Sequence, residues 1–402
     1  MGVLELLIMT LLIQNSLQLN IERSVYDTFT PFVRFSRFWT RSTFRTWLFD
    51  IPKAQSENKI QPQIDETVPF SCPLNNTRSP ERPTNVNKLR PGDIDVIGAM
   101  GDSLTAGFGL LATNLVSVLF ENRGLSFSGG GDKTWRNYLT LPNILKEFNP
   151  NLQGFSTGNS YTFEKESNLN VAEGGAVSDN TPYMAQMLAN RIKLDPKVNI
   201  KLDWKMITYF IGGNDFCWDM CFRSNPESIV DKHRNNLIEA LRILRDNLPR
   251  TLVNVINAPS IEIIANIPNK PPICYITHSA ECPCIFGLGY QNYQPMFTDI
   301  MRKWQKVEQE VVDMDEFDTD DFSVVLQPFT LNYIVPDLSH MSVDCFHPSQ
   351  KGTAQAANSL WNNLLEPVGK KSTRETNLFS NFKCPTAKNP FLFTRRNSEI
   401  ST

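Results

Sequence analysis

The sequence predicts an α/β fold, a three-layer sandwich built on a central, mostly parallel sheet of five strands. Within residues 93–370, short apolar segments of strand length alternate with longer segments of helical periodicity. Strands that alternate with helices form βαβ units, and their crossover helices cover both faces of a parallel sheet. The composition is that of an ordinary globular domain, with 41% hydrophobic and 20% charged residues.

Five segments carry the pattern of a buried strand. The first, residues 94–100, is a short apolar run that ends at Gly101. The second, residues 169–172, is shorter and its pattern is weaker. The remaining three are residues 204–211, 251–256 and 322–326.

Three segments are predicted to form helices between or after these strands. One begins at about Pro226, with Ser224 or Asn225 as its cap, and ends before Pro249. Its apolar residues recur on one face, which is typical of a helix packed on a sheet. The other two helices are expected around residues 297–312 and 349–365.

The segments outside this region are predicted to have other roles. Residues 1–18 contain an apolar run too short to span a bilayer, which we interpret as a signal peptide; a short buried helix is the alternative. Residues 19–92 are expected to be an N-terminal extension and a Pro-rich linker or surface wrap, and residues 371–402 a polar C-terminal tail. The aromatic stretch at 21–50 is expected to pack on the main domain, with a membrane-surface helix as the alternative.

The charge and hydropathy of the chain limit its partners. A net charge of -3 provides no bulk attraction to nucleic acid. Beyond the N-terminal run, no segment is long and apolar enough for a transmembrane helix, so we expect no transmembrane anchor. Contact with a membrane or micelle surface is therefore expected to be transient.

The eight cysteines favour an oxidising compartment. Their number is even, and they do not show the paired Cys-x-x-Cys spacing of a zinc site. Asn75 lies in a glycosylation sequon, which agrees with secretion. We therefore expect a secreted or lumenal glycoprotein with disulfide bonds and with no bound metal or other cofactor. A cytosolic protein with buried free thiols is the alternative.

Ser103 is the candidate nucleophile. It follows the first predicted strand in the sequence Gly101-Asp-Ser-Leu104, and ligand sites of open α/β sheets lie at the carboxyl ends of the strands. The alternative is that Ser103 only caps the helix that follows. To act as a nucleophile at neutral pH, a serine hydroxyl needs a base.

Asp344 and His347 are the candidate partners of Ser103. They lie in Asp344-Cys-Phe-His347, between the last predicted strand and the last predicted helix. His347 can accept the serine proton, and Asp344 can orient the imidazole and stabilise its cation. His340, in the same loop, is the weaker candidate for the base.

Two further motifs can supply hydrogen-bond donors to the oxyanion of an acyl transfer. Gly212-Gly-Asn-Asp215 follows the third predicted strand and offers the side-chain amide of Asn214. Gly174-Gly-Ala176 follows the second and offers the unobstructed backbone N–H of Gly175. Each motif alone is ordinary turn chemistry. Because all four motifs follow predicted strands of one sheet, we expect them to meet in one acyl-transfer site.

These motifs resemble the four sequence blocks of the GDSL, or SGNH, hydrolases. The resemblance implies an SGNH-hydrolase (flavodoxin-like) fold, with Ser103 as nucleophile, His347 as base and Asp344 as its partner. It also implies an oxyanion hole formed by the backbone N–H groups of Ser103 and Gly175 and the Asn214 side chain. Longer strings, which lie within roughly residues 69–385, are similar to the animal phospholipase B branch: Met100–Gly107, Arg123–Ser126, Leu141–Leu145, Phe148–Leu152, Gly212–Asp215, Asp344–His347 and Leu360–Gly369.

The resemblance implies a serine hydrolase that cleaves the fatty acyl ester bonds of phospholipids and lysophospholipids through an acyl-enzyme, without a metal. The alternatives are a carbohydrate or small-ester acetylesterase with the same site, and a catalytically inactive lipid-binding scaffold. We also expect Cys72 to pair with Cys384, because they bracket the similar region, and Cys217 to pair with Cys221.

Overall fold

Four parallel strands form the central sheet, in the order β1-β2-β3-β4. The computed structural model describes residues 50–399, so the expected signal peptide and all but the last residue of the stretch at 21–50 lie outside the described residues. The strands are almost entirely buried, as in a parallel sheet covered on both faces, which confirms the predicted fold class. Their bounds are Ile94–Gly101 (β1), Trp204–Phe210 (β2), Thr251–Ile256 (β3) and Phe322–Gln327 (β4).

The prediction of a fifth strand at residues 169–172 is wrong. This segment does lie beside β1: the Ala99 N–H donates to the Leu169 carbonyl (3.0 Å), and the Val171 N–H donates to the Ala99 carbonyl (2.8 Å). The contact forms only an isolated bridge, because another segment occupies the preceding part of the same edge, where the Ile97 N–H donates to the Gln153 carbonyl (2.9 Å). Two short segments therefore share an edge that one strand was expected to cover.

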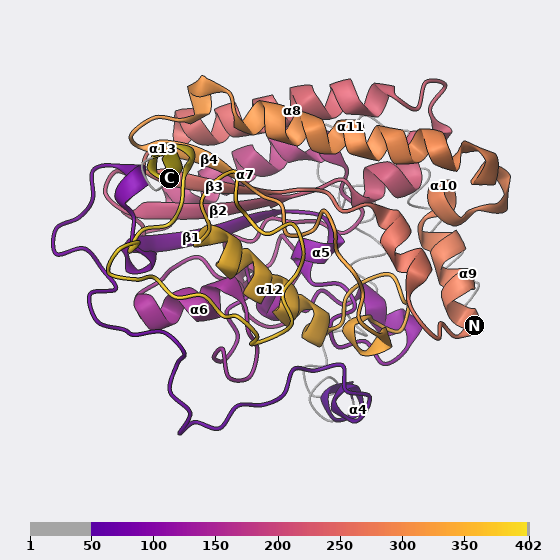
Figure 1. Cartoon of the computed structure of the whole chain (residues 1–402), viewed down its shortest axis with the longest axis horizontal. Helices are drawn as coiled ribbons and strands as arrows, with labels where there is room; N and C mark the ends of the chain where they lie inside the picture. Colours follow the sequence, from indigo (N-terminus) through magenta and orange to yellow (C-terminus); the bar gives the residue numbers. More distant parts are fainter. Residues whose placement is uncertain (1–49, 400–402) are drawn as a thin grey trace.

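Helices cover both faces of the sheet (Figure 1). One layer contains α7 (Thr181–Leu194), α8 (Ser228–Asn247) and α11 (Gln294–Val312). The other contains α6 (Leu141–Phe148) and α12 (Gln350–Leu364). The helices expected at 226–248, 297–312 and 349–365 correspond to α8, α11 and α12, within three residues at each end.

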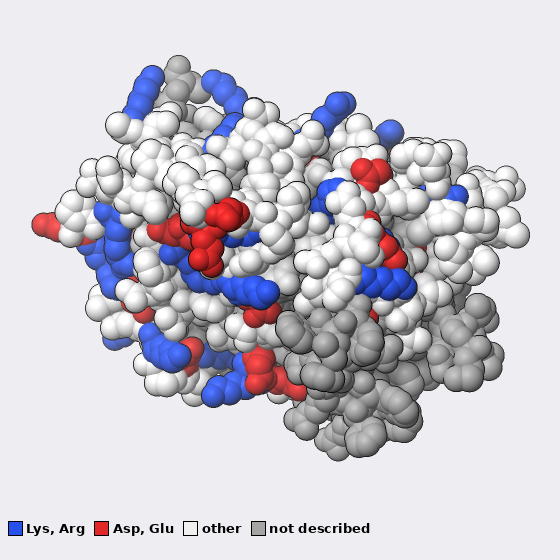
Figure 2. All heavy atoms as spheres, turned by 90° about the horizontal axis from the view of Figure 1, so that it is seen from below, with Lys and Arg blue, Asp and Glu red and all other residues white. Residues whose placement is uncertain are grey.

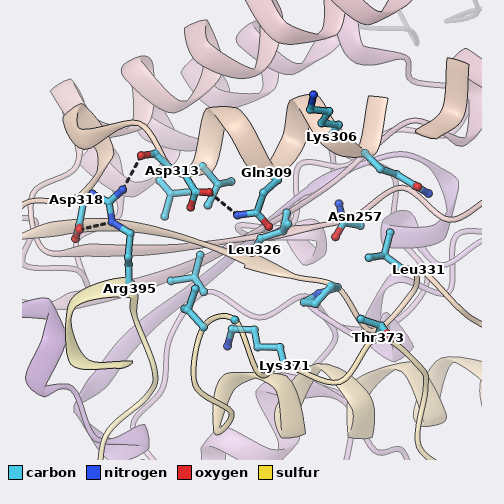
Figure 3. Close-up of a pocket in the computed structure, with 17 residues that line it drawn as sticks. Asn257, Lys306, Gln309, Asp313, Asp318, Leu326, Leu331, Lys371, Thr373 and Arg395 are labelled. Atoms are coloured by element: carbon cyan, nitrogen blue, oxygen red, sulfur yellow. Dashed lines mark hydrogen bonds and ion pairs between the residues drawn. The ribbon is translucent and has the colours of Figure 1, made fainter. Parts of the chain in front are cut away.

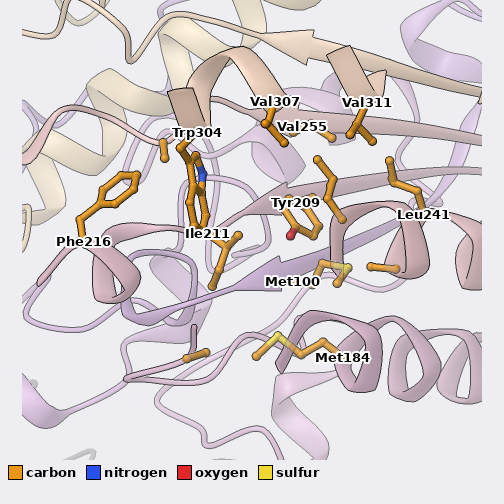
Figure 4. Close-up of a cluster of buried hydrophobic side chains, with 14 of the residues drawn as sticks. Met100, Met184, Tyr209, Ile211, Phe216, Leu241, Val255, Trp304, Val307 and Val311 are labelled. Atoms are coloured by element: carbon orange, nitrogen blue, oxygen red, sulfur yellow. The ribbon is translucent and has the colours of Figure 1, made fainter. Parts of the chain in front are cut away.

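Two hydrophobic clusters join these layers to the sheet. In the first, Tyr209 and Val255 of the strands pack with Met184, Leu241 and Trp304 of the helices (Figure 4). The second lies between the sheet and the α6–α12 layer. Burial of these side chains stabilises the sandwich, at roughly 1.5–3 kcal/mol for each fully buried large side chain.

The segments before β1 and after α12 pack on this core. The described part of the chain begins just before α4 (Ile51–Ser56), and further on the backbone N–H of Gln61 donates to the Gln350 side chain (2.8 Å). In the C-terminal segment the Leu392 N–H donates to the Leu89 carbonyl (2.8 Å), just before α13 (Arg395–Glu399). Residues 50–92 and 371–399 are thus fastened to the domain between them, as well as to each other.

Four disulfides bring together all eight cysteines. Cys72 is joined to Cys384, the pair expected to close the ends of the similar region. The expected Cys217–Cys221 pair is wrong, since each of these residues bonds to a cysteine beyond β3. The other three pairs are Cys217–Cys282, Cys221–Cys284 and Cys274–Cys345.

The described surface is mixed in charge. On the face seen in Figure 2, blue and red side chains are interspersed among uncharged residues. Within residues 50–399, no helix combines the length and the apolar character needed to cross a bilayer.

Candidate active site

Ser103 lies at the carboxyl end of β1, at the start of the short helix α5 (Ser103–Ala106). The turn into this helix requires Gly101, because a Cβ atom there would lie 2.2 Å from the Phe210 carbonyl oxygen of β2. Asp102 caps α5, since its Oδ1 accepts a hydrogen bond from the Leu104 N–H (2.9 Å). The capping role considered for Ser103 therefore belongs to its neighbour, and the Ser103 backbone N–H is at a position with no intrahelical acceptor.

His347 lies within hydrogen-bond reach of Ser103. Its Nε2 is 2.9 Å from the Ser103 Oγ, and its Nδ1 is 2.7 Å from the Asp344 Oδ2. Asp344 is fully buried, and its Oδ1 accepts hydrogen bonds from the backbone N–H groups of Phe346 and His347. These contacts hold the carboxylate where it favours a proton on Nδ1, which leaves Nε2 able to accept the serine proton.

His340 does not take this position. Asp337 lies three residues before it, the same offset that separates Asp344 from His347, so the local spacing does not distinguish the two histidines. The Nδ1 of His340 is 3.3 Å from an Asp337 carboxylate whose side chain is 56% exposed. The contact with Ser103 is made by His347 instead.

The residues predicted to bind an oxyanion lie beside this site. Asn214 follows β2, and its Nδ2 donates to the Ala176 carbonyl (2.8 Å). This contact brings the Asn214 loop against the glycine motif, where Gly175 has a φ of 78° that favours glycine. An amide nitrogen has two N–H donors, so one N–H of Asn214 is still available to a substrate oxygen. Asn214 lines the same pocket as Ser103, whereas Gly175 does not.

The pocket beside Ser103 is mostly apolar. Its cavity volume is about 120 Å³. Side chains from several separate parts of the chain contribute its walls, among them Phe127, Phe210, Ile261, Ile264, Phe329 and Phe346. The pocket can therefore hold an apolar group next to the serine hydroxyl.

Sequence reasoning missed Glu281, at the end of α9 (Pro272–Glu281). Its Oε2 is buried without a hydrogen-bond partner and lies 3.8 Å from the Nδ1 of His347. Burial, and secondly the charge of Asp344, raise the pKa of Glu281 well above its ordinary value. Burial also raises the pKa of Asp102, which lines the pocket, to about 6. Glu281 lies far from the catalytic motifs in the sequence, so no local spacing could have indicated it.

A second cavity, of about 360 Å³, lies along β4 and α11 and shares no lining residue with the Ser103 pocket (Figure 3). Arg395, which lines this cavity, donates to the Asp318 carboxylate (2.9 Å) and to the Asp313 carbonyl (2.6 Å). Gln309 donates to the Asp313 side chain (2.7 Å). The candidate active site is therefore the Ser103 pocket and not this second cavity.

The chain is similar in sequence to one protein-family model and to three mammalian proteins. The family model described as GDSL-like Lipase/Acylhydrolase matches residues 97–360. The chain is 41% identical to "Phospholipase B1, membrane-associated" of Mus musculus over 84% of its length, 39% identical to that of Rattus norvegicus over 85%, and 38% identical to that of Homo sapiens over 79%. These matches cover only 22–24% of the length of the three relatives.

Proposed function

Because the chain belongs to the GDSL-like lipase and acylhydrolase family, we propose that it is a serine hydrolase that cleaves the fatty acyl ester bonds of phospholipids and lysophospholipids. The observation that carries this proposal is the hydrogen-bonded series from Ser103 through His347 to Asp344, next to an apolar pocket. Ser103, Asp344 and His347 are its proposed catalytic residues.

The proposed reaction has two steps. In the first, the Ser103 Oγ attacks the acyl carbonyl carbon while His347 takes the serine proton, and Asp344 stabilises the imidazolium. The oxyanion accepts hydrogen bonds from the Asn214 side chain and the backbone N–H groups of Ser103 and Gly175. As the ester C–O bond breaks, His347 gives its proton to the leaving alcohol oxygen.

In the second step, water cleaves the acyl-enzyme. His347 removes a proton from the water, whose oxygen attacks the acyl carbon and forms a second oxyanion in the same hole. The bond to the Ser103 Oγ then breaks, the proton returns to that oxygen, and the free fatty acid leaves. No step needs a metal or another cofactor. Glu281, Asp344 and His347 do have ligand atoms within 4.8 Å of one another, a spacing that could hold a metal ion, so the rate should also be measured with and without EDTA.

The apolar walls of the pocket favour a long acyl chain over an acetyl group. An acetyl ester would leave most of these walls in contact with water, whereas a fatty acyl chain gains roughly 0.8 kcal/mol for each buried CH₂ group. The relatives that the chain matches are named as phospholipases B. The acetylesterase and the inactive lipid-binding scaffold remain the outcomes against which the proposal is tested.

The test is the release of fatty acid from phosphatidylcholine and lysophosphatidylcholine by the wild type and by Ser103→Ala. A short, water-soluble acetyl ester is the control substrate. Release of long-chain acid by the wild type alone supports the proposal. Cleavage of only the acetyl ester would instead support the acetylesterase, and no cleavage of any substrate would support the inactive scaffold. A loss of activity in EDTA that added metal restores would contradict the metal-free mechanism.

We also propose that the protein is secreted or lumenal, meets its lipid at a membrane or micelle surface, and is glycosylated at Asn75. Asn75 is exposed, and the four disulfides agree with an oxidising compartment. A glycosidase-sensitive mass shift that is absent from Asn75→Gln would support the modification.

A further inference from the structure

A segment that follows η10 (Ile261–Asn266) and ends in the first turn of α11 is almost free of charge. Only one residue of the range 271–298 is Asp, Glu, Lys or Arg, whereas these residue types make up 20% of the whole chain. The range includes α9, α10 (Pro283–Phe286) and the first turn of α11. That residue is Glu281, whose side chain turns inward toward His347. The outer surface of this segment is therefore uncharged.

The same surface exposes large apolar and aromatic side chains. They are Tyr275 (61% exposed), Ile276 (53%), Leu288 (86%), Tyr293 (53%) and Met296 (40%). We call these five residues the apolar patch. The half-exposed Phe222 adjoins it, with its ring 6.0 Å from that of Tyr290. These side chains lie on helices that contact one another in series, α9 to α10, α10 to η11 (Leu288–Tyr293) and η11 to α11. Large apolar side chains exposed together on adjoining elements are typical of a binding surface.

The patch lies at the same end of the sheet as the catalytic site. Figure 1 shows α9 and α10 beyond the carboxyl ends of the strands, on the side of α5. α9 also contacts the catalytic loop directly, because the Thr277 hydroxyl donates to the Asp344 carbonyl (2.5 Å) and the His278 ring lies 2.8 Å from the Cys345 carbonyl. Just before α9, Ile261 and Ile264 line the Ser103 pocket.

We propose that the apolar patch docks on a phospholipid surface and so brings the Ser103 pocket to the lipid. The proposal rests on the proposed function for the identity of its partner. A phospholipid is held in an aggregate by its acyl chains, and its passage through water to the pocket would expose those chains. Apart from the Lys270 ammonium, which lies 5.0 Å from the centre of the Tyr275 ring, this surface has no ionic group to dehydrate at the contact. Aliphatic side chains can enter the acyl layer, while tyrosine hydroxyls stay at the level of the headgroups.

Vesicle binding tests the patch independently of hydrolysis. All variants carry Ser103→Ala, and their partition onto phosphatidylcholine vesicles is measured by co-sedimentation. The test variant adds Ile276→Glu and Leu288→Glu. The control adds Leu202→Glu and Leu194→Glu, whose side chains have similar exposures of 47% and 82% but lie near the amino ends of the strands. Circular dichroism and thermal unfolding check that both variants fold.

We expect the patch variant to partition at least about tenfold more weakly, because two apolar side chains that enter the lipid become charged, and the control to change less than twofold. Equal partition of the two variants would overturn the proposal. So would binding that requires anionic lipid and disappears in salt. A patch variant that loses self-association but keeps its vesicle binding would show that the patch instead binds a second copy of the chain. If binding depends on the patch but the wild type, with Ser103 intact, does not hydrolyse phospholipid, only the proposed function is refuted.

Discussion

The disulfide between Cys274 and Cys345 fastens α9 to the loop that carries both Asp344 and His347. Cys345 lies between these two residues and has a φ of 59°, in the left-handed region that cysteine rarely adopts. The surrounding contacts with Thr277 and His278 hold the same stretch of backbone. The hydrogen bond from His347 to Asp344 thus depends on a loop that is held from outside its own segment.

We therefore predict that the double variant Cys274→Ser and Cys345→Ser has a kcat about a hundredfold lower, with its secondary structure intact. The strained loop can relax without the crosslink, and a displacement of the catalytic groups by about 1 Å costs a factor of this size. The measurement is the rate on a soluble ester, with circular dichroism as the check on folding.

The matched control is Cys72→Ser with Cys384→Ser, which removes the disulfide that joins the two flanking segments. Loss of this crosslink should lower the free energy of unfolding by about 2–5 kcal/mol, while kcat changes less than threefold. If the two double variants lose kcat equally, the effect is one of general stability and not of the catalytic loop.

The catalytic motifs could be predicted from the sequence, whereas most of the disulfide pairs could not. The motifs with Ser103, Asn214 and Asp344 could be predicted because each follows a strand, and the strands were visible as local apolar runs. Disulfide partners depend on the distances between separate elements of the fold, and these distances cannot be inferred from the spacing of cysteines in the sequence. Cys217 and Cys221 are near neighbours in the chain, yet both bond to the α9–α10 segment.

The side chain of Asn214 should contribute to the rate and not to ground-state binding. Asn214→Ala is expected to lower kcat by about 10²–10³-fold with little change in KM, because its hydrogen bond forms to the oxyanion of the transition state. Steady-state kinetics on a soluble ester provide the measurement, and Asn190→Ala, on the exposed face of α7, is the control. A kcat within threefold of the wild type would exclude this role for the amide.

Glu281 should add a step to the pH dependence of kcat/KM. Burial and the charge of Asp344 raise its pKa, so the carboxyl is neutral in the acidic range and ionises only at higher pH. The new negative charge then lies 3.8 Å from the His347 Nδ1 and favours the imidazolium that forms in the transition state. Wild-type kcat/KM should rise as Glu281 ionises, and Glu281→Gln should lack this rise.

The comparison needs profiles from pH 5 to 10 on a soluble ester, where lipid packing has no part. Asp337→Asn is the matched control, because Asp337 is the exposed partner of the buried His340, and this variant should keep the rise. Identical pH profiles of kcat/KM for the wild type and Glu281→Gln would mean that the Glu281 carboxyl does not act on His347. The missed role of Glu281 and the wrong prediction of a fifth strand have the same cause. Each depends on which distant segment of the chain lies at a given place, as residues 153 and 169 lie along β1.

Glu308 should make the folded state less stable as pH rises. It is fully buried in α11, accepts hydrogen bonds from the side chains of Asn257 (2.7 Å) and Trp304 (3.1 Å), and burial raises its pKa from 4.5 to about 8. Between these values the unfolded chain releases its proton while the folded protein keeps it. The free energy of unfolding therefore falls by at most about 1.4 kcal/mol per pH unit from this group, and the fall ends above pH 8.

Glu308→Gln removes this titration and retains the shape of the side chain. The free energy of unfolding of this variant should therefore decrease less between pH 5 and pH 8 than that of the wild type. Urea unfolding at several pH values, with the disulfides intact, gives the slopes. Glu310→Gln is the control on the same helix, because the hydrogen bond from Arg234 lowers the pKa of that exposed carboxyl and places its titration below this range. Equal slopes for wild type and Glu308→Gln would show that Glu308 is already ionised in the folded protein at pH 5.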